Sequence, residues 1–270
     1  MQKNLYYRTV LRRENALQNF FLSLLSTLSS HPRLLLEVFI RKGFGERYFR
    51  LISGFSVFLI LGIFPLFAET LSALGDHLKQ IVTAYGGMPG STPEAPPQEP
   101  SFLFRYLTWY IFLVLFLLKS IQHHLAMKRL PSIFDFQRYS LCGGTINPIF
   151  EKIKLGGKPA DVRTIETLLE PGFFFIIGIV LWLFGQNLGI LLVVSSIFYS
   201  ASYFNAYISG DNFIMDKIDE MICNQELANV FLNDDDGEAM GFRPRFRKPE
   251  NRDIREKILP MMTEEVTEAK

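Results

Sequence analysis

Two adjacent histidines, His123 and His124, have side chains suited to metal binding or acid–base catalysis, and they follow directly on a long apolar segment. Neighbouring side chains on an α-helix point about 100° apart, so the two imidazoles do not form a natural metal pair. No carboxylate or cysteine stands at ligand spacing from them. We therefore predict no metal site and no enzymatic activity. A lipid-modifying enzyme that uses His123, His124 and Asp135 at the membrane interface is the third-ranked alternative for function.

Two glycine-containing loops match ligand-binding motifs only in part. The acidic turn at 233–238 has Leu232 where an EF-hand needs its first acidic ligand, and Arg243 where it needs a bidentate Glu. The glycine pair before Lys158 lacks the preceding Gly of a phosphate-binding loop, and Pro159 replaces the required Ser or Thr. We predict a solvated turn at the first loop, a helix-preceding loop at the second, and no cofactor.

Small residues in the last apolar segments are spaced for helix packing. Ser196 and Ser200 are one helical turn apart, and Gly185 and Gly189 form a GxxxG pair. Small residues at this spacing let helices approach closely, so we predict that these four residues pack helices together. Ligand binding by the same polar face is the alternative. A serine nucleophile would need a His or acidic partner, and the apolar segments contain none.

Four apolar segments dominate a chain of 270 residues that is 49% hydrophobic. A membrane-spanning helix needs about 20 residues, and the segments 51–68 and 102–118 approach this length. The segments 171–185 and 188–205 contain a near-continuous apolar pair from Pro171 to Tyr203, which a turn at 185–187 divides into runs of about 14 to 16 residues. We predict an all-α polytopic membrane protein with about four transmembrane helices. The third and fourth form a short hairpin that either crosses a thinned bilayer or re-enters it.

The distribution of basic residues predicts the orientation. Residues 69–101 contain only Lys79, whereas residues 1–50, 119–170 and 206–270 contain 9, 8 and 9 Lys and Arg. Short loops rich in Lys and Arg stay in the cytoplasm. We therefore predict an external loop with a Pro-rich linker at 69–101, and a protein of the bacterial inner (cytoplasmic) membrane with both termini in the cytoplasm.

The cytoplasmic segments carry surfaces for the membrane or for other proteins. An apolar stripe at helical spacing precedes the first span, followed by one basic cluster, and a second basic cluster lies in the tail. The stripe comprises Leu17, Phe20, Phe21, Leu24, Leu25 and Leu28; the clusters are Arg41, Lys42, Arg47 and Arg50, and Arg243, Arg245, Arg247 and Lys248. Each basic residue near an anionic leaflet contributes roughly 1 kcal/mol. Anionic lipid headgroups and acidic protein surfaces are the expected contacts, and no nucleic acid is expected.

One charge, Arg105, lies within the predicted spans, close enough to one end to reach the interface. Transport coupled to protons or cations usually requires ionisable groups deeper in the membrane. We therefore predict a non-enzymatic membrane subunit that anchors or scaffolds partner subunits at the cytoplasmic face of a larger inner-membrane complex, such as a bacterial secretion or conjugation apparatus. A channel or transporter subunit is the alternative. A tail helix beginning at Asp211, with the stripe Ile214, Ile218, Met221 and Ile222, is one surface for such partners.

Overall fold

The chain folds almost entirely into helices in the computed structural model. The residues described are 3–4, 6–11, 16–86, 102–130, 136–233 and 245–264. The α-helices are α1 (Ala16–Ile40), α2 (Leu51–Gly86), α3 (Phe102–Lys128), α4 (Phe136–Tyr139), α5 (Pro148–Glu151), α6 (Val162–Thr164), α7 (Glu170–Leu183), α8 (Asn187–Asn233) and α9 (Arg252–Met262). Two π-helical segments are η1 (Tyr7–Leu11) and η2 (Ile165–Leu169).

Three short antiparallel strand pairs join parts of the chain that are close in space. They are formed by β1 (Lys3–Asn4) with β6 (Thr263–Glu264), β2 (Lys42–Phe44) with β3 (Gly143–Thr145), and β4 (Lys154–Leu155) with β5 (Lys158–Pro159). The first pair joins the two ends of the chain. The second ties the segment after α1 to the loop that follows α3.

Four of the described helices are long and apolar enough to cross a membrane: Leu51–Gly75, Phe104–Lys128, Val162–Leu183 and Asn187–Leu232. This confirms the prediction of a helical chain with four candidate transmembrane segments. The third and fourth candidates have 22 and 46 residues, so both helices are longer than hydropathy predicted.

The third helix begins earlier because α6, η2 and α7 run on without a break. Pro171 lies within this continuous helix and cannot donate to the Thr167 carbonyl, which accepts a hydrogen bond from Ser200 Oγ at 2.6 Å instead. The longer helix also brings Glu166 and Glu170 into the candidate span. The helices of the structure therefore contain charged residues besides Arg105, and these lie outside the shorter spans predicted from the sequence.

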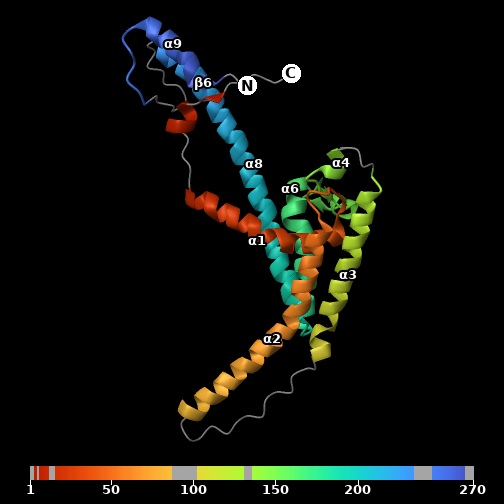
Figure 1. The fold of residues 1–270 in the computed structure, drawn as a ribbon. Coiled ribbons are helices and arrows are strands. Elements are labelled where there is room, and N and C mark those ends of the chain that lie inside the picture. Colours follow the sequence, from red (N-terminus) through yellow and green to blue (C-terminus); the bar gives the residue numbers. More distant parts are fainter. Residues whose placement is uncertain are drawn as a thin grey trace. The chain divides into compact units, whose positions relative to one another are not determined.

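The chain divides into two compact units, and the larger is Leu24–Phe204. Within it α2 and α3 pack along each other, and α7 and α8 form a hairpin that turns at Gly185, where φ is +74°. Figure 1 shows α4, α6 and the short strands gathered at one end, where α2 begins and α3 ends. These are the segments that the sequence predicts to be cytoplasmic. The buried core contains Leu36, Tyr106, Trp109, Leu113, Leu192 and Tyr199, and beside it Leu35, Phe44, Phe49, Phe116 and Met127.

Helix α2 continues well past the predicted end of the first span at Ala68. Residues 69–86, the first part of the predicted external loop, belong to this same helix, and Leu71, Leu74 and Leu78 on it are exposed. Pro65 lies inside the helix. The Pro-rich linker falls outside the described residues.

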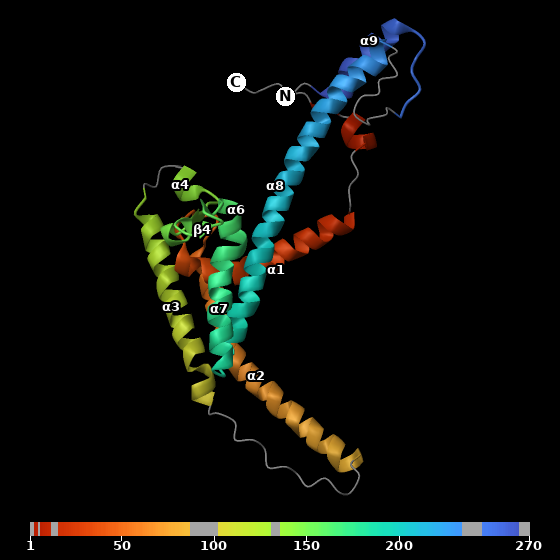
Figure 2. The same cartoon turned by 180° about the vertical axis from the view of Figure 1, so that it is seen from behind.

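The smaller unit combines Met1–Ser23 with Asn205–Lys270. Its aromatic contacts join the beginning of the chain to the tail: the Tyr6 ring packs edge-on against Phe246 at 5.5 Å, and Phe246 packs against Phe231 at 5.3 Å. The Tyr6 hydroxyl accepts a hydrogen bond from the backbone N–H of Arg245 at 2.6 Å. Helix α9 lies beside the end of α8 in both views (Figures 1 and 2).

Candidate functional site

Three charged residues, two on α1 and one directly after its last residue, point into the interior of the larger unit. Arg33, Glu37 and Arg41 are spaced four residues apart, which places them on one helix face. The residues between them, from Leu34 to Ile40, are mostly buried and apolar. This part of α1 therefore lies in the core together with its charged side chains. Glu37 is 0% exposed and Arg41 is 2% exposed. Charges this deeply buried require partners.

The Arg41 guanidinium connects α1 to η2, α7 and α8. Its Nε donates to Glu170 Oε2 at 3.1 Å, and its Nη2 donates to the same oxygen. Nη2 also lies 3.1 Å from Glu166 Oε1, and Nη1 donates to the Tyr203 hydroxyl at 2.5 Å. The Tyr199 hydroxyl donates to Glu170 Oε2 as well. All three guanidinium nitrogens are therefore engaged.

Glu37 forms the second centre of this cluster. Its carboxylate accepts hydrogen bonds from the hydroxyls of Tyr48 and Tyr203, the latter at 2.7 Å, and Arg33 Nε lies 3.5 Å away. Arg33 also donates to Ser202 Oγ at 2.8 Å. Burial raises the pKa of Glu37, and the opposing effects of Arg33 and the two hydroxyls do not cancel this shift. Burial likewise raises the pKa of Tyr48, with a further contribution from Glu37, so this hydroxyl remains a donor.

The Arg–Glu–Tyr cluster comprises Arg33, Glu37, Arg41, Tyr48, Glu166, Glu170, Tyr199, Ser202 and Tyr203. Its three carboxyls exceed its two guanidinium groups by one, and Glu170 Oε1 is buried without a hydrogen-bond partner among the described residues. Because the groups engage each other, the arrangement is suited to locking α1, α7 and α8 together. Among the described residues, no group of three or more His, Cys, Asp or Glu is placed to hold a metal ion.

Arg41 was predicted to contact lipid or a partner, and the structure contradicts this. Its charge is neutralised inside the bundle rather than at the surface. Lys42, Arg47, Arg50, Arg245 and Arg247 are exposed, Lys248 is half-buried, and Arg243 lies outside the described residues.

The predicted packing residues lie where α7 and α8 meet, with one exception. A Cβ on Gly189 would stand 2.4 Å from the Trp182 backbone N and 2.5 Å from the Gly178 carbonyl O, so the two helices touch here. Ser196 donates to the Pro171 carbonyl at 2.5 Å and Ser200 donates to the Thr167 carbonyl at 2.6 Å. A Cβ on Gly185 would meet nothing within 4 Å, and this residue forms the turn instead, so Gly178 is the residue that faces Gly189.

The predicted interfacial stripe on α1 is largely exposed. Leu17, Phe20, Phe21, Leu24 and Leu28 are exposed, and Leu25 is half-buried. That this stripe contacts lipid or a partner protein stays a prediction.

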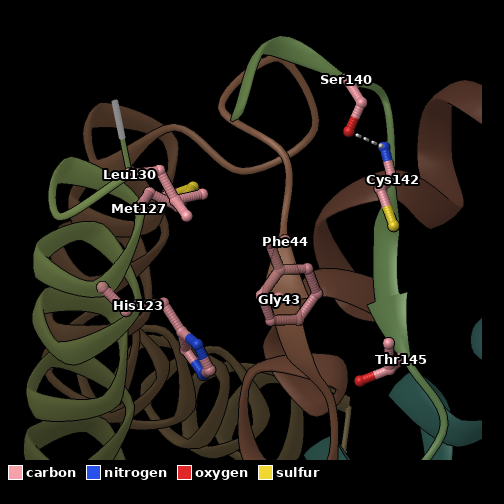
Figure 3. A pocket seen from close by; sticks show the side chains of 9 residues that line it. Gly43, Phe44, His123, Met127, Leu130, Ser140, Cys142 and Thr145 are labelled. Atoms are coloured by element: carbon pink, nitrogen blue, oxygen red, sulfur yellow. Dashed lines mark hydrogen bonds between the residues drawn. The ribbon is translucent and has the colours of Figure 1, made fainter. Parts of the chain in front are cut away.

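A cavity of about 580 Å³ lies between the end of α3 and the β2–β3 pair. Figure 3 shows His123, Met127 and Leu130 on the α3 side, facing Phe44, Cys142 and Thr145. His123 Nε2 donates to the Val38 carbonyl at 2.9 Å, and its ring lies edge-on to Phe44 at 4.9 Å. His123 therefore forms part of the packed cavity wall. His124 is half-buried, and Asp135 lies outside the described residues.

Sequence reasoning missed the acidic and aromatic members of the Arg–Glu–Tyr cluster. The signal for them was present: Glu37 interrupts an otherwise apolar helical run, with an arginine four residues away on either side. Glu166 and Glu170 repeat the same spacing just before an apolar segment. Comparisons with protein-family models, with curated proteins and with solved structures find no match for this chain.

Proposed function

We propose that this protein is a non-enzymatic subunit of an inner-membrane complex and anchors a partner protein at the cytoplasmic face. The length of α8 supports this proposal. The helix has 47 residues, more than twice the roughly 20 that cross a bilayer. A large part of it is therefore expected to extend beyond the hydrocarbon layer.

The observation that carries the proposal is an uncovered apolar stripe on the later part of α8. Ile214, Met215, Ile218 and Met221 share one face, and each is between 45% and 62% exposed. The opposite face is covered within the smaller unit, where Cys223 and Leu227 are buried. Apolar side chains at this spacing form the contact surface of helix–helix and helix-in-groove complexes.

The charge around this stripe favours a protein over a lipid surface as its occupant. Between Asn205 and Leu232 the helix carries five acidic residues and a single basic one, Lys217. An anionic leaflet repels such a helix, whereas a basic amphipathic helix complements it. The expected occupant of the stripe is therefore a basic amphipathic helix of a partner protein.

The Arg–Glu–Tyr cluster supports the anchoring role by holding α8 in place. Arg33 and Arg41 bind Ser202 and Tyr203, which lie directly before the part of α8 that belongs to the smaller unit. A helix that is held at this point is suited to anchoring a partner protein.

Photo-crosslinking from two positions of α8 tests the proposal. A photoreactive residue at Ile218 is expected to crosslink one stoichiometric protein in native membranes, through a basic amphipathic segment identified by mass spectrometry. The same residue at Asn212, exposed on another face of the helix, is expected to crosslink it poorly.

Paired charge substitutions provide the matched control. Ile218→Asp is expected to abolish co-purification of the crosslinked protein in mild detergent, whereas Asn212→Asp introduces the same charge and retains it. Equal retention by both variants, crosslinks to lipid alone, or a wild-type protein that purifies without any stoichiometric partner would each refute the proposal.

A further inference from the structure

The cavity between α3 and the β2–β3 pair has the size and lining of a ligand site. Its volume of about 580 Å³ lies within the ~300–1,000 Å³ range of ligand pockets. Apolar side chains line both sides of the cavity, Met127 and Leu130 on α3 and Phe44 on β2, and Ser140 and Thr145 add hydroxyl groups on the side of the β2–β3 pair. A cavity with this mixed lining suits a molecule with an apolar chain and a polar head.

Two basic residues, Lys42 and Lys119, lie near the cavity and form its basic rim. Both are exposed, and both are within electrostatic range of the cavity residue His123. Lys42 directly precedes the cavity residue Gly43, and Lys119 lies one helical turn before His123. The polar head that this rim would attract is therefore an anion.

The sequence places the cavity at the level of the headgroups. The apolar run of α3 ends at Leu118 and is followed by Lys119, and the cavity residues of α3 begin one turn later at His123. If α3 crosses the membrane as proposed, this end of the helix lies at the cytoplasmic interface. Phospholipid headgroups occupy that level.

We infer that this cavity binds an anionic phospholipid, with acyl carbons against Phe44, Met127 and Leu130 and the phosphate against Lys42 and Lys119. This inference rests on the proposed membrane location. It does not depend on the partner protein, because the stripe on α8 belongs to the smaller unit.

Alkylation of Cys142 can report whether the cavity is occupied, because this cysteine is exposed and lines the cavity. The other cysteine, Cys223, is buried. In a Cys223→Ser background, alkylation of Cys142 by N-ethylmaleimide is measured by mass spectrometry in detergent micelles. Phosphatidylglycerol added to the micelles is expected to slow alkylation in a saturable manner. Phosphatidylcholine, which has the same chains but no net charge, is expected to protect far less.

Two sets of substitutions separate lipid recognition from general effects of charge. Lys42→Gln and Lys119→Gln together are expected to weaken protection roughly thirtyfold, since each contributes about 1 kcal/mol. The control combines Lys154→Gln and Lys158→Gln, which remove two exposed charges from the β4–β5 pair and are expected to leave protection unchanged.

A third variant, Ala126→Trp, is expected to block the cavity and abolish protection while the basic rim is intact. Native mass spectrometry of wild type is expected to show one bound phosphatidylglycerol. Equal protection by the two lipids, protection by a fatty acid equal to that by phosphatidylglycerol, or full protection in the rim variant would each overturn the inference. The assay contains no partner, so its failure leaves the anchoring proposal intact, and failed crosslinking at Ile218 leaves this inference intact.

Discussion

Arg41 and Glu170 form a buried ion pair that joins the end of α1 to the beginning of α7, with exposed side-chain fractions of 2% and 0%. The residues are separated by most of the larger unit in sequence. Two charges removed from water stabilise a fold only while each compensates the other.

Loss of the Arg41 charge is therefore expected to be severe. Arg41→Met keeps the side-chain length but leaves Glu170 buried without its cation, at a cost of about 3–5 kcal/mol in the free energy of unfolding. The midpoint of thermal unfolding in detergent, followed by circular dichroism, measures the effect. Lys42→Met, at the exposed neighbouring residue, is the control and is expected to change stability by less than about 0.5 kcal/mol.

The double variant Arg41→Met with Glu170→Gln tests whether the pair itself is responsible. It removes both charges, so it is expected to recover part of the stability lost by Arg41→Met alone. Additive effects of the two substitutions would contradict the assignment of this ion pair.

Glu37 is expected to make stability depend on pH. Because burial raises its pKa in the folded protein above the ordinary value of 4.5, folding favours the protonated carboxyl. The stability from this preference is complete below pH 4.5 and is lost as pH rises through the folded-state pKa. The unfolding midpoint of the wild-type protein is therefore expected to fall as the pH is raised from about 4.5 to 8.

In Glu37→Gln this component of the pH dependence is expected to vanish, since the amide does not titrate. Glu151→Gln, at an exposed position on α5, serves as the control and keeps the wild-type profile. An unchanged slope in Glu37→Gln would show that another group titrates.

Gly189 is expected to tolerate no side chain. Gly189→Ala places a methyl group within 2.5 Å of backbone atoms of Gly178 and Trp182, which forces α7 and α8 apart. Overpacking of this kind typically costs about 1–3 kcal/mol. Gly172→Ala is the matched control, because its added methyl meets nothing within 4 Å. Equal unfolding midpoints for the two variants would refute the close crossing.

Arg255 is expected to secure the tail. It is buried on α9 and donates to the Phe231 carbonyl at 3.3 Å. Arg255→Ala leaves that carbonyl without this donor, and limited proteolysis is expected to cut the tail faster by a factor of roughly ten, from a loss of about 1.5 kcal/mol. Arg252→Ala, which removes an exposed arginine paired with Glu256, is expected to be cut at the wild-type rate.

Reporter fusions test the predicted orientation. A fusion at Ala95 is expected to be active outside the cytoplasm, and one at the C-terminus inside it, because almost all Lys and Arg lie in the other loops. A C-terminal reporter active outside would reverse the orientation.

Hydropathy was sufficient to locate all four candidate membrane helices. A long apolar segment without charges can satisfy its backbone hydrogen bonds in a membrane only as a helix or as part of a closed barrel. Hydropathy misplaced the beginning of the third helix, where Glu166 and Glu170 end the apolar window. Those carboxylates become compatible with a helix interior only when Arg41 neutralises them, and a window of neighbouring residues contains no information about a partner far along the chain.

The same limit explains the error at Arg41. Lys42 and Arg47 are exposed as basic residues before a span usually are, and local sequence treats Arg41 as one of them. Its spacing from Glu37 within an apolar helix was the only local sign of burial. The pairing with Glu170 and Tyr203 depends on tertiary packing.

The Arg–Glu–Tyr cluster also constrains the order in which the protein is assembled. Helix α1 leaves the ribosome first, but the carboxylates that Arg41 neutralises are synthesised more than a hundred residues later. Before then α1 can pack against α3, as Phe39 does against Phe112, but the Arg41 guanidinium lacks Glu166 and Glu170. The burial of Arg41 is therefore expected to be a late step of folding that is completed only after α7 has been synthesised.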